Sequence, residues 1–290
     1  GNRQPRLLAA RARRARRGIY LSSTPTPRGV TIRDIRDRKG KEPIVVVTAY
    51  DVLFGRLVDQ AGVDIVLVGD SLGNVVAGYD TTLPVTLDNM IYHGAAVCRG
   101  VSRALVTVDM PFLTYQLDVA SALANAGRLI VETGAEAVKL EGGSERIAET
   151  VSRIVEIGIP VMGHLGFTPQ SVNAIGVRVQ GREAEAEARL LAEAKRLDEA
   201  GAFAVVLELI PAALAKRISE SISIPTIGIG AGGGCDGQVL VLPDMLGLNE
   251  GFQPRFLTHS ANLSDTVRDH VRAYGDDVRQ HRSPSADQSF

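Results

Sequence analysis

Eight short apolar runs, each followed by a segment of helical pattern or by a turn, recur along the chain from residue 44 onward. The alternation of strands and helices predicts a parallel sheet, and continuous apolar runs indicate strands covered on both faces. The count of eight favours an α/β fold of a single domain, a closed (β/α)₈ TIM barrel, over an open doubly wound sheet. The runs are IVVVTAYD (44–51), DIVLVGDS (64–71), ALVTVDMP (104–111), AVKLEGG (137–143), PVMGHLG (160–166), FAVVLEL (203–209), PTIGIGAG (225–232) and QVLVLPD (238–244).

The segments between these runs have the pattern of amphipathic helices. Residues 53–62, 118–134, 185–201 and 212–222 space their apolar side chains by three and four. Three of them end in Ala-Gly or Thr-Gly just before the next apolar run, which is typical of a helix C-cap. We therefore predict a catalytic barrel over residues 30–263. A C-terminal helix starting at a Ser cap and a tail are expected over 264–290.

An Arg-rich arm precedes the predicted barrel, over residues 1–29. The first 33 residues hold nine Arg and no acid, so 23 basic and 33 acidic residues remain elsewhere, a net charge of −10. An acidic body argues against nucleic acid as a partner. The arm is either a disordered extension or a targeting peptide. No apolar run reaches the length of about 18 residues that spans a membrane. The two cysteines have neither metal nor redox spacing. We therefore expect a cytoplasmic protein, with organellar targeting by the arm as the alternative.

Ionisable residues stand at the ends of five consecutive predicted strands. In a TIM barrel the C-terminal ends of the strands form the active site. Each residue alone has an ordinary explanation, such as a turn cap for an Asp, a core hydrogen bond for the His, or a structural ion pair for Lys139 and Glu141. Together they predict a shared site. The residues are Asp70 with Ser71, Asp109, Lys139 with Glu141, His164 and Glu208.

The residue types indicate the chemistry of this site. Asp70, Asp109 and Glu141 form a set of oxygen ligands with no cysteine nearby, which favours Mg²⁺ over Zn²⁺. Lys139 beside such a metal suits an anionic ligand such as a keto acid, and Glu208 could act as a base. Metal coordination to a carbonyl stabilises the negative charge of an enolate. Lys139 and Glu141 lie two apart, so they face the same side of a strand. Without metal and substrate we expect this pair to be the least satisfied polar feature of the core.

The stretch GIGAGG (228–233) fits the glycine pattern of dinucleotide-binding turns. It follows the seventh strand rather than opening a first βαβ unit, and no strand with an acidic end lies about 20 residues beyond it. We interpret it as a tight turn at the barrel mouth rather than as an NAD site.

Longer motifs make the sequence resemble the ketopantoate hydroxymethyltransferase family over residues 30–257. GHLGFTPQSVN and the long run that begins at Leu67 are the most specific of them. They are TAYD (48–51), LVGDSLGNVVAGYDTTLPVT (67–86), VDMPF (108–112), VKLEGG (138–143), GHLGFTPQSVN (163–173), VQGR (179–182), LELIP (207–211), IPTIGIGAG (224–232) and CDGQVLV (235–241).

The resemblance implies a Mg²⁺-dependent (β/α)₈ barrel that transfers a hydroxymethyl group from 5,10-methylenetetrahydrofolate to 3-methyl-2-oxobutanoate, forming ketopantoate for pantothenate biosynthesis. It implies that Asp70, Asp109 and Glu141 surround the metal. Ser71, Lys139 and His164, with Asp70 and Asp109, would hold the keto acid, and Glu208 would remove its C3 proton to give an enolate. It also implies assembly into a homo-oligomer, a decamer in many family members.

The sequence departs from this family in the loop after Asn173, where AIGVRVQGR is one residue short, and in both terminal segments. The shorter loop puts in question whether it can close over the site.

Two alternative functions remain at this point. One is a Mg²⁺-dependent lyase or mutase of the phosphoenolpyruvate mutase and isocitrate lyase group, although neither Cys98 nor Cys235 lies in the loop that such lyases use. The other is a catalytically inactive scaffold, which would have no reason to keep the costly acids.

Overall fold

The computed structural model describes residues 29–290, in which eight parallel strands form a closed barrel in the order β1 to β8. Each strand pairs with the next along the chain, and β8 closes the barrel by pairing with β1. The predicted TIM barrel is confirmed. The strands are β1 (Ile44–Thr48), β2 (Ile65–Val68), β3 (Leu105–Asp109), β4 (Ala137–Lys139), β5 (Val161–Gly166), β6 (Ala204–Glu208), β7 (Thr226–Ile229) and β8 (Gly237–Leu240).

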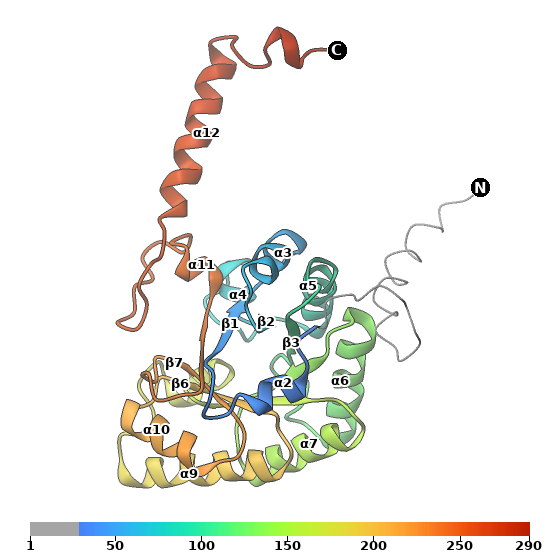
Figure 1. Cartoon of the computed structure of the whole chain (residues 1–290), viewed down its shortest axis with the longest axis vertical. Coiled ribbons are helices and arrows are strands. Elements are labelled where there is room, and N and C mark those ends of the chain that lie inside the picture. Colours follow the sequence, from blue (N-terminus) through green and yellow to red (C-terminus); the bar gives the residue numbers. More distant parts are fainter. Residues whose placement is uncertain (1–28) are drawn as a thin grey trace, which may run out of the picture.

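Helices follow the strands and surround the barrel (Figure 1). The four segments predicted as amphipathic helices are α3, α6, α9 and α10. The helices are α2 (Ile32–Asp37), α3 (Val52–Gln60), α4 (Leu72–Val75), α5 (Leu87–Gly100), α6 (Val119–Thr133), α7 (Glu145–Glu156), η2 (Pro169–Ser171), α8 (Val172–Ile175), α9 (Ala184–Glu199), α10 (Ala212–Ser221), α11 (Leu242–Met245), α12 (Leu263–Arg279) and η3 (Ala286–Gln288).

Two apolar cores follow from the alternation of side chains along each strand. Val66, Val106 and Val138 point outward into the layer between strands and helices. Residues of the opposite phase, such as Leu67 and Leu105, fill the barrel interior together with Ile35 of α2. Because side chains two apart share a face, the same interior phase carries polar side chains where the strands reach the mouth.

The helix C-caps predicted from Ala-Gly and Thr-Gly are confirmed. Gly134 caps α6 in the left-handed conformation, at φ 78°. Gly62 and Gly201, at φ 90°, come one residue after the caps of α3 and α9. The GIGAGG stretch is a turn after β7, with Gly230 at φ 61° and Gly232 at φ 76°. Glycine adopts these angles at little steric cost, which explains its use at each turn.

Several predicted boundaries were wrong. The eighth strand does not run over 238–244: β8 begins at Gly237 and ends at Leu240, and Leu242–Met245 form α11 with Pro243 in its first turn. A proline is preorganised for that position because its missing N–H has no helical partner there. The terminal helix α12 begins at Leu263 after Asn262, so Ser264 is not its cap; its hydroxyl donates to the Asn262 side chain.

The predicted N-terminal extension, residues 1–29, lies outside the described residues except for Gly29. At the other end, α12 extends away from the barrel (Figure 1), and none of its residues is buried. Within residues 29–290 no helix combines the length and the apolar character that crossing a membrane would require.

Candidate active site

The mouth of the barrel collects the ionisable residues predicted from the strand ends. Asp109 ends β3, Lys139 ends β4, His164 lies within β5 and Glu208 ends β6. Glu141 comes two residues after β4, so it keeps the inward phase of Lys139 although it lies beyond the strand. Each of these side chains therefore faces the interior at the C-terminal end.

Lys139 and His164 connect the acids. Lys139 Nζ lies 2.8 Å from Asp109 Oδ1 and 3.4 Å from His164 Nδ1. That same imidazole nitrogen lies 3.5 Å from Glu141 Oε1. All four residues are buried, with at most 5% of their surface exposed. The close approach of acids and bases in the interior indicates a functional cluster rather than a set of solvated charges.

Asp70 and Ser71 reach the same cluster from the loop after β2, which ends at Val68, two residues earlier than predicted. The Asp70 N–H donates to Asp109 Oδ2 at 3.0 Å. Ser71 Oγ and the Tyr50 hydroxyl are hydrogen-bonded at 2.8 Å, and Ser71 has no hydrogen bond to the acids among the described contacts. A Cβ at Gly69 would lie 2.8 Å from Ser71 Oγ, so any larger residue there would displace the Ser71 hydroxyl.

Glu208 is the acid that is least enclosed, with 18% of its side chain exposed, and its Oε2 lies 3.2 Å from His164 Nε2. Burial and the Lys139 charge lower the pKa of His164, but its contacts with Glu141 and Glu208 outweigh them and raise the pKa to about 9. Two nearby carboxyl groups thus favour the protonated imidazole.

Asp70 lies in a buried cluster with two other acids, and its pKa is raised there. Its burial, followed by the charges of Asp109 and Glu141, raises its pKa to about 8. The same three carboxylates raise the pKa of Lys139, although burial opposes them. In the metal-free chain Asp70 thus holds a proton at neutral pH, and a bound cation could take the place of that proton.

Two carboxylate oxygens of the cluster are suited to bind a cation. Asp109 Oδ1 and Glu141 Oε1 are buried and accept no hydrogen bond of acceptable geometry, although Asp109 Oδ1 is ion-paired with Lys139. The prediction that the Lys139–Glu141 pair is the least satisfied polar feature of the core was therefore wrong. Lys139 is ion-paired with Asp109, and buried side-chain atoms without a hydrogen bond also occur in Thr82, Thr107, Gln116 and His164. Residues 29–290 contain no set of three His, Cys, Asp or Glu side chains already arranged to hold a metal, so the acids would have to close in on one.

The sequence did not single out Gln170 and Tyr115, which lie among the acids. Gln170 is 5% exposed, and its side-chain amide nitrogen donates to Asp70 Oδ2 at 2.8 Å. The Tyr115 hydroxyl donates to Gln170 Oε1 at 2.7 Å and accepts from the Glu141 N–H at 3.0 Å. The only sequence signal was their position inside or near motifs, Gln170 in GHLGFTPQSVN and Tyr115 after VDMPF.

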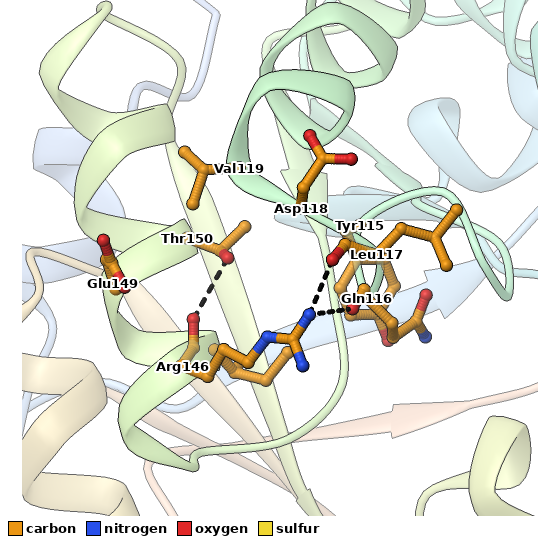
Figure 2. Close-up of a pocket in the computed structure, with 9 residues that line it drawn as sticks. Tyr115, Gln116, Leu117, Asp118, Val119, Arg146, Glu149 and Thr150 are labelled. Carbon is orange, nitrogen blue, oxygen red and sulfur yellow. Dashed lines mark hydrogen bonds between the residues drawn. The ribbon is translucent and has the colours of Figure 1, made fainter.

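The loop that carries Tyr115 borders a pocket of about 270 Å³ on the outside of the barrel. Figure 2 shows the Arg146 guanidinium of α7 reaching the backbone oxygens of Gln116 and Leu117. The two hydrogen bonds, at 3.1 and 2.6 Å, tie this loop to α7. The pocket therefore belongs to the support of the site, and the cluster itself is closed from solvent by its own loops.

Comparison with known sequences gives a consistent result. The sequence profile of the family described as ketopantoate hydroxymethyltransferase matches residues 29–286. A 3-methyl-2-oxobutanoate hydroxymethyltransferase of Syntrophus aciditrophicus is 52% identical over 93% of this chain and 100% of its own length. The enzyme of the same description from Prosthecochloris aestuarii is 54% identical over 90% of this chain and 96% of its own.

Solved structures of the same fold are more distant in sequence. A phosphonopyruvate hydrolase aligns with a TM-score of 0.59 and 11% identity, over 89% of this chain and 90% of its own. A 2,3-dimethylmalate lyase, described as a phosphoenolpyruvate mutase/isocitrate lyase superfamily member, aligns at 0.55 with 15% identity, over 89% and 91% of the two chains. At these identities the likeness concerns the fold alone.

Proposed function

The chain belongs to the ketopantoate hydroxymethyltransferase family, and we propose that the buried cluster at the barrel mouth is its catalytic site. The enzyme is a transferase that forms ketopantoate from 3-methyl-2-oxobutanoate, the role shared by its relatives. The rival assignment to a lyase or mutase rests on fold alone, at 11–16% identity, whereas sequence relatives at 52–55% support the transferase.

Mg²⁺ is the cation that fits the cluster. Asp70, Asp109 and Glu141 would surround it, because hard oxygen ligands are the ones Mg²⁺ prefers. The buried oxygens without hydrogen bonds, on Asp109 and Glu141, support this choice. When bound, the ion would stabilise the negative charge that grows on the keto acid as its C3 proton leaves.

The keto acid is an anion, and the cationic side chains of the cluster suit it. Lys139 and His164 would hold its carboxylate and keto oxygens, with the Ser71 hydroxyl and the acids Asp70 and Asp109 beside them. Glu208 lies at the open side of the cluster, next to His164. A carboxylate there is placed to take the C3 proton.

The carbon nucleophile that results would attack the methylene carbon of 5,10-methylenetetrahydrofolate. A carbon–carbon bond forms, and both bonds from that carbon to folate nitrogens N5 and N10 break. One water supplies the hydroxyl group, and its second proton and the proton removed from C3 end on the two nitrogens, which releases tetrahydrofolate. No residue is assigned to the folate. Because the cluster is buried, both substrates require the covering loops to open, including residues 166–182 after β5.

The main support for this proposal is the pair of buried carboxylate oxygens without hydrogen bonds, on Asp109 and Glu141. Exchange of the C3 proton, which is the first half of the reaction, tests it. Purified protein with Mg²⁺ and 3-methyl-2-oxobutanoate in D₂O should exchange the C3 proton for deuterium without any folate, followed by NMR. The same sample with EDTA should exchange at the background rate. Folded, Mg²⁺-loaded protein that shows no exchange would refute the enolate mechanism. Ketopantoate formed after methylenetetrahydrofolate is added, detected by mass spectrometry, tests the full transfer.

We also propose that the protein is a homo-oligomer, of decamer size as the family resemblance implies, in which α12 contacts another copy. Its side chains Val267, Val271, Tyr274 and Val278 recur at spacings of four, three and four, and are 43–64% exposed. A helix without tertiary packing is marginal in water, so an apolar stripe of this kind requires a covering surface.

Light scattering of purified protein tests the oligomer. Val271→Asp together with Tyr274→Asp should lower the particle mass, because two charges would have to be buried in the contact. The exposed pair Asp276→Ala and Asp277→Ala serves as control on the same helix. An unchanged mass in the first variant would show that the stripe is not an interface.

We also propose a cytoplasmic location, which is in keeping with the two free thiols of Cys98 and Cys235. Cell fractionation would test it.

A further inference from the structure

The side-chain amide of Gln170 has all of its hydrogen-bonding capacity in use. Its nitrogen donates to Asp70 Oδ2 at 2.8 Å and to the Met110 backbone oxygen at 3.0 Å. Its oxygen accepts from the Tyr115 hydroxyl at 2.7 Å and from Gln116 Nε2 at 2.9 Å. Four bonds, one to the loop after β2 and three to the loop after β3, fix the plane of the amide and decide which of its ends faces Asp70.

The backbone of the same residue holds a second acid. The Gln170 N–H donates to Glu141 Oε2 at 3.0 Å. One residue of the loop after β5 therefore ties one oxygen of Asp70 through its side chain and one oxygen of Glu141 through its main chain. The third acid follows the same pattern, since the Asp70 N–H holds Asp109 Oδ2.

These bonds separate the two oxygens of each acid. Glu141 Oε2 and Asp109 Oδ2 are held by N–H groups, while Glu141 Oε1 and Asp109 Oδ1 are the buried oxygens without a hydrogen bond. A hydrogen bond from the protein to one oxygen of a metal-binding carboxylate restricts its rotation and directs the other oxygen. The oxygens without a hydrogen bond face the cationic side chains instead: Asp109 Oδ1 lies 2.8 Å from Lys139 Nζ and Glu141 Oε1 lies 3.5 Å from His164 Nδ1. They are thus the oxygens that a bound cation could share.

We propose that Gln170 is a positioning residue for the cation: by binding Asp70 Oδ2 and Glu141 Oε2 it orients these acids so that their other oxygens can meet the metal. This inference rests on the proposed function, because it assumes that the three acids bind Mg²⁺. Gln170 does not itself supply a ligand, since its oxygen is occupied by Tyr115 and Gln116. Its contribution is that the acids need not be ordered when the ion arrives.

An alternative is that Gln170 only anchors the loop after β5 against the loop after β3. The two explanations differ in what Gln116 does. Gln116 also donates a hydrogen bond to Gln170 Oε1 and so joins the same two loops, but within residues 29–290 its side chain has no hydrogen bond to a carboxylate. Loss of a loop anchor would affect both glutamine variants, whereas loss of carboxylate positioning would affect mainly the Gln170 variant.

The test is the affinity for Mg²⁺ alone, measured by calorimetry on full-length protein without keto acid. Gln170→Met keeps the length of the side chain and removes the bond to Asp70. We expect its dissociation constant for Mg²⁺ to rise about 10- to 100-fold, the usual effect of losing a hydrogen-bond partner of a metal ligand. Gln116→Met should stay within about threefold of the wild type. At saturating Mg²⁺, Gln170→Met should regain most of its kcat, which a disrupted active site would not.

Thermal unfolding in EDTA checks that each variant is folded. If Gln170→Met does not fold, Tyr115→Phe decides, because it removes only the hydroxyl that holds Gln170 Oε1 and the Glu141 N–H; its Mg²⁺ affinity should fall by a smaller factor. Wild-type Mg²⁺ affinity in the folded variant, or equal losses in the Gln116 and Gln170 variants, would overturn the positioning role alone. A wild-type protein that binds no Mg²⁺ would overturn the proposed metal site as well.

Discussion

Replacing Glu208 with glutamine should abolish the exchange of the C3 proton of 3-methyl-2-oxobutanoate while Mg²⁺ and the keto acid still bind. The amide has nearly the shape of the carboxylate, so its place beside His164 is kept, but it cannot accept a proton at neutral pH. Removing a general base typically costs about 10²- to 10⁴-fold in rate. We expect a loss of this size in the NMR exchange rate.

Binding and chemistry are separated by a second measurement on the same variant. Calorimetric titration of Mg²⁺-loaded Glu208→Gln with the keto acid should give a dissociation constant within about threefold of the wild type, since none of the acids proposed to bind the metal is altered. Glu220→Gln is the matched control, because Glu220 is an exposed glutamate on α10. Exchange at the wild-type rate in Glu208→Gln would show that another group is the base.

The alternation of side chains along strands explains how much of the site could be predicted. Asp109, Lys139, His164 and Glu208 lie on strands that the apolar runs identified, and the period of two fixes their inward phase. The closed barrel then brings strands far apart in sequence to one mouth. The predicted grouping of these residues therefore depends only on the strand pattern and on the count of eight.

The contacts of Gln170 could not be predicted in the same way. Its partners Asp70 and Tyr115 are 100 and 55 residues away along the chain, and none of the three residues lies on a strand. The conformation of this loop depends on Gly166 at φ 95° and on the turn η2 rather than on a repeating pattern. Loop geometry is set by tertiary contacts that no periodicity records, so the support of the acids is visible only in the structure.

The wrong boundaries have a local cause. Residues 238–244 were predicted as a strand because apolar side chains continue through Leu242, but the chain needs only four residues, Gly237–Leu240, to pair with β1 and β7. After that point Pro243 favours a helix start. The same sequence was compatible with both structures, and the register of the closed barrel decided between them.

Replacing Lys139 with methionine should destabilise the metal-free protein by about 3–5 kcal/mol, the usual cost of removing one partner of a buried ion pair. Methionine keeps the length and apolar packing of the side chain. It leaves Asp109, whose Oδ1 lies 2.8 Å from Lys139 Nζ, without its cation beside two further acids. Urea unfolding in EDTA measures this loss. The dissociation constant of the keto acid should also rise about 10- to 100-fold, as expected for a lost charged hydrogen bond.

Mg²⁺ should restore part of the stability of this variant, and that outcome separates two roles of the lysine. If Lys139 compensates the acids, a divalent cation bound among them replaces the missing charge, and stability rises with Mg²⁺ concentration as ligand binding to the folded state requires. Keto acid affinity should remain weak, because the contact of the lysine with the substrate is still absent. Lys216→Met, at an exposed lysine, should change stability by less than about 0.5 kcal/mol. A stable Lys139→Met protein that binds the keto acid normally would assign neither role to Lys139.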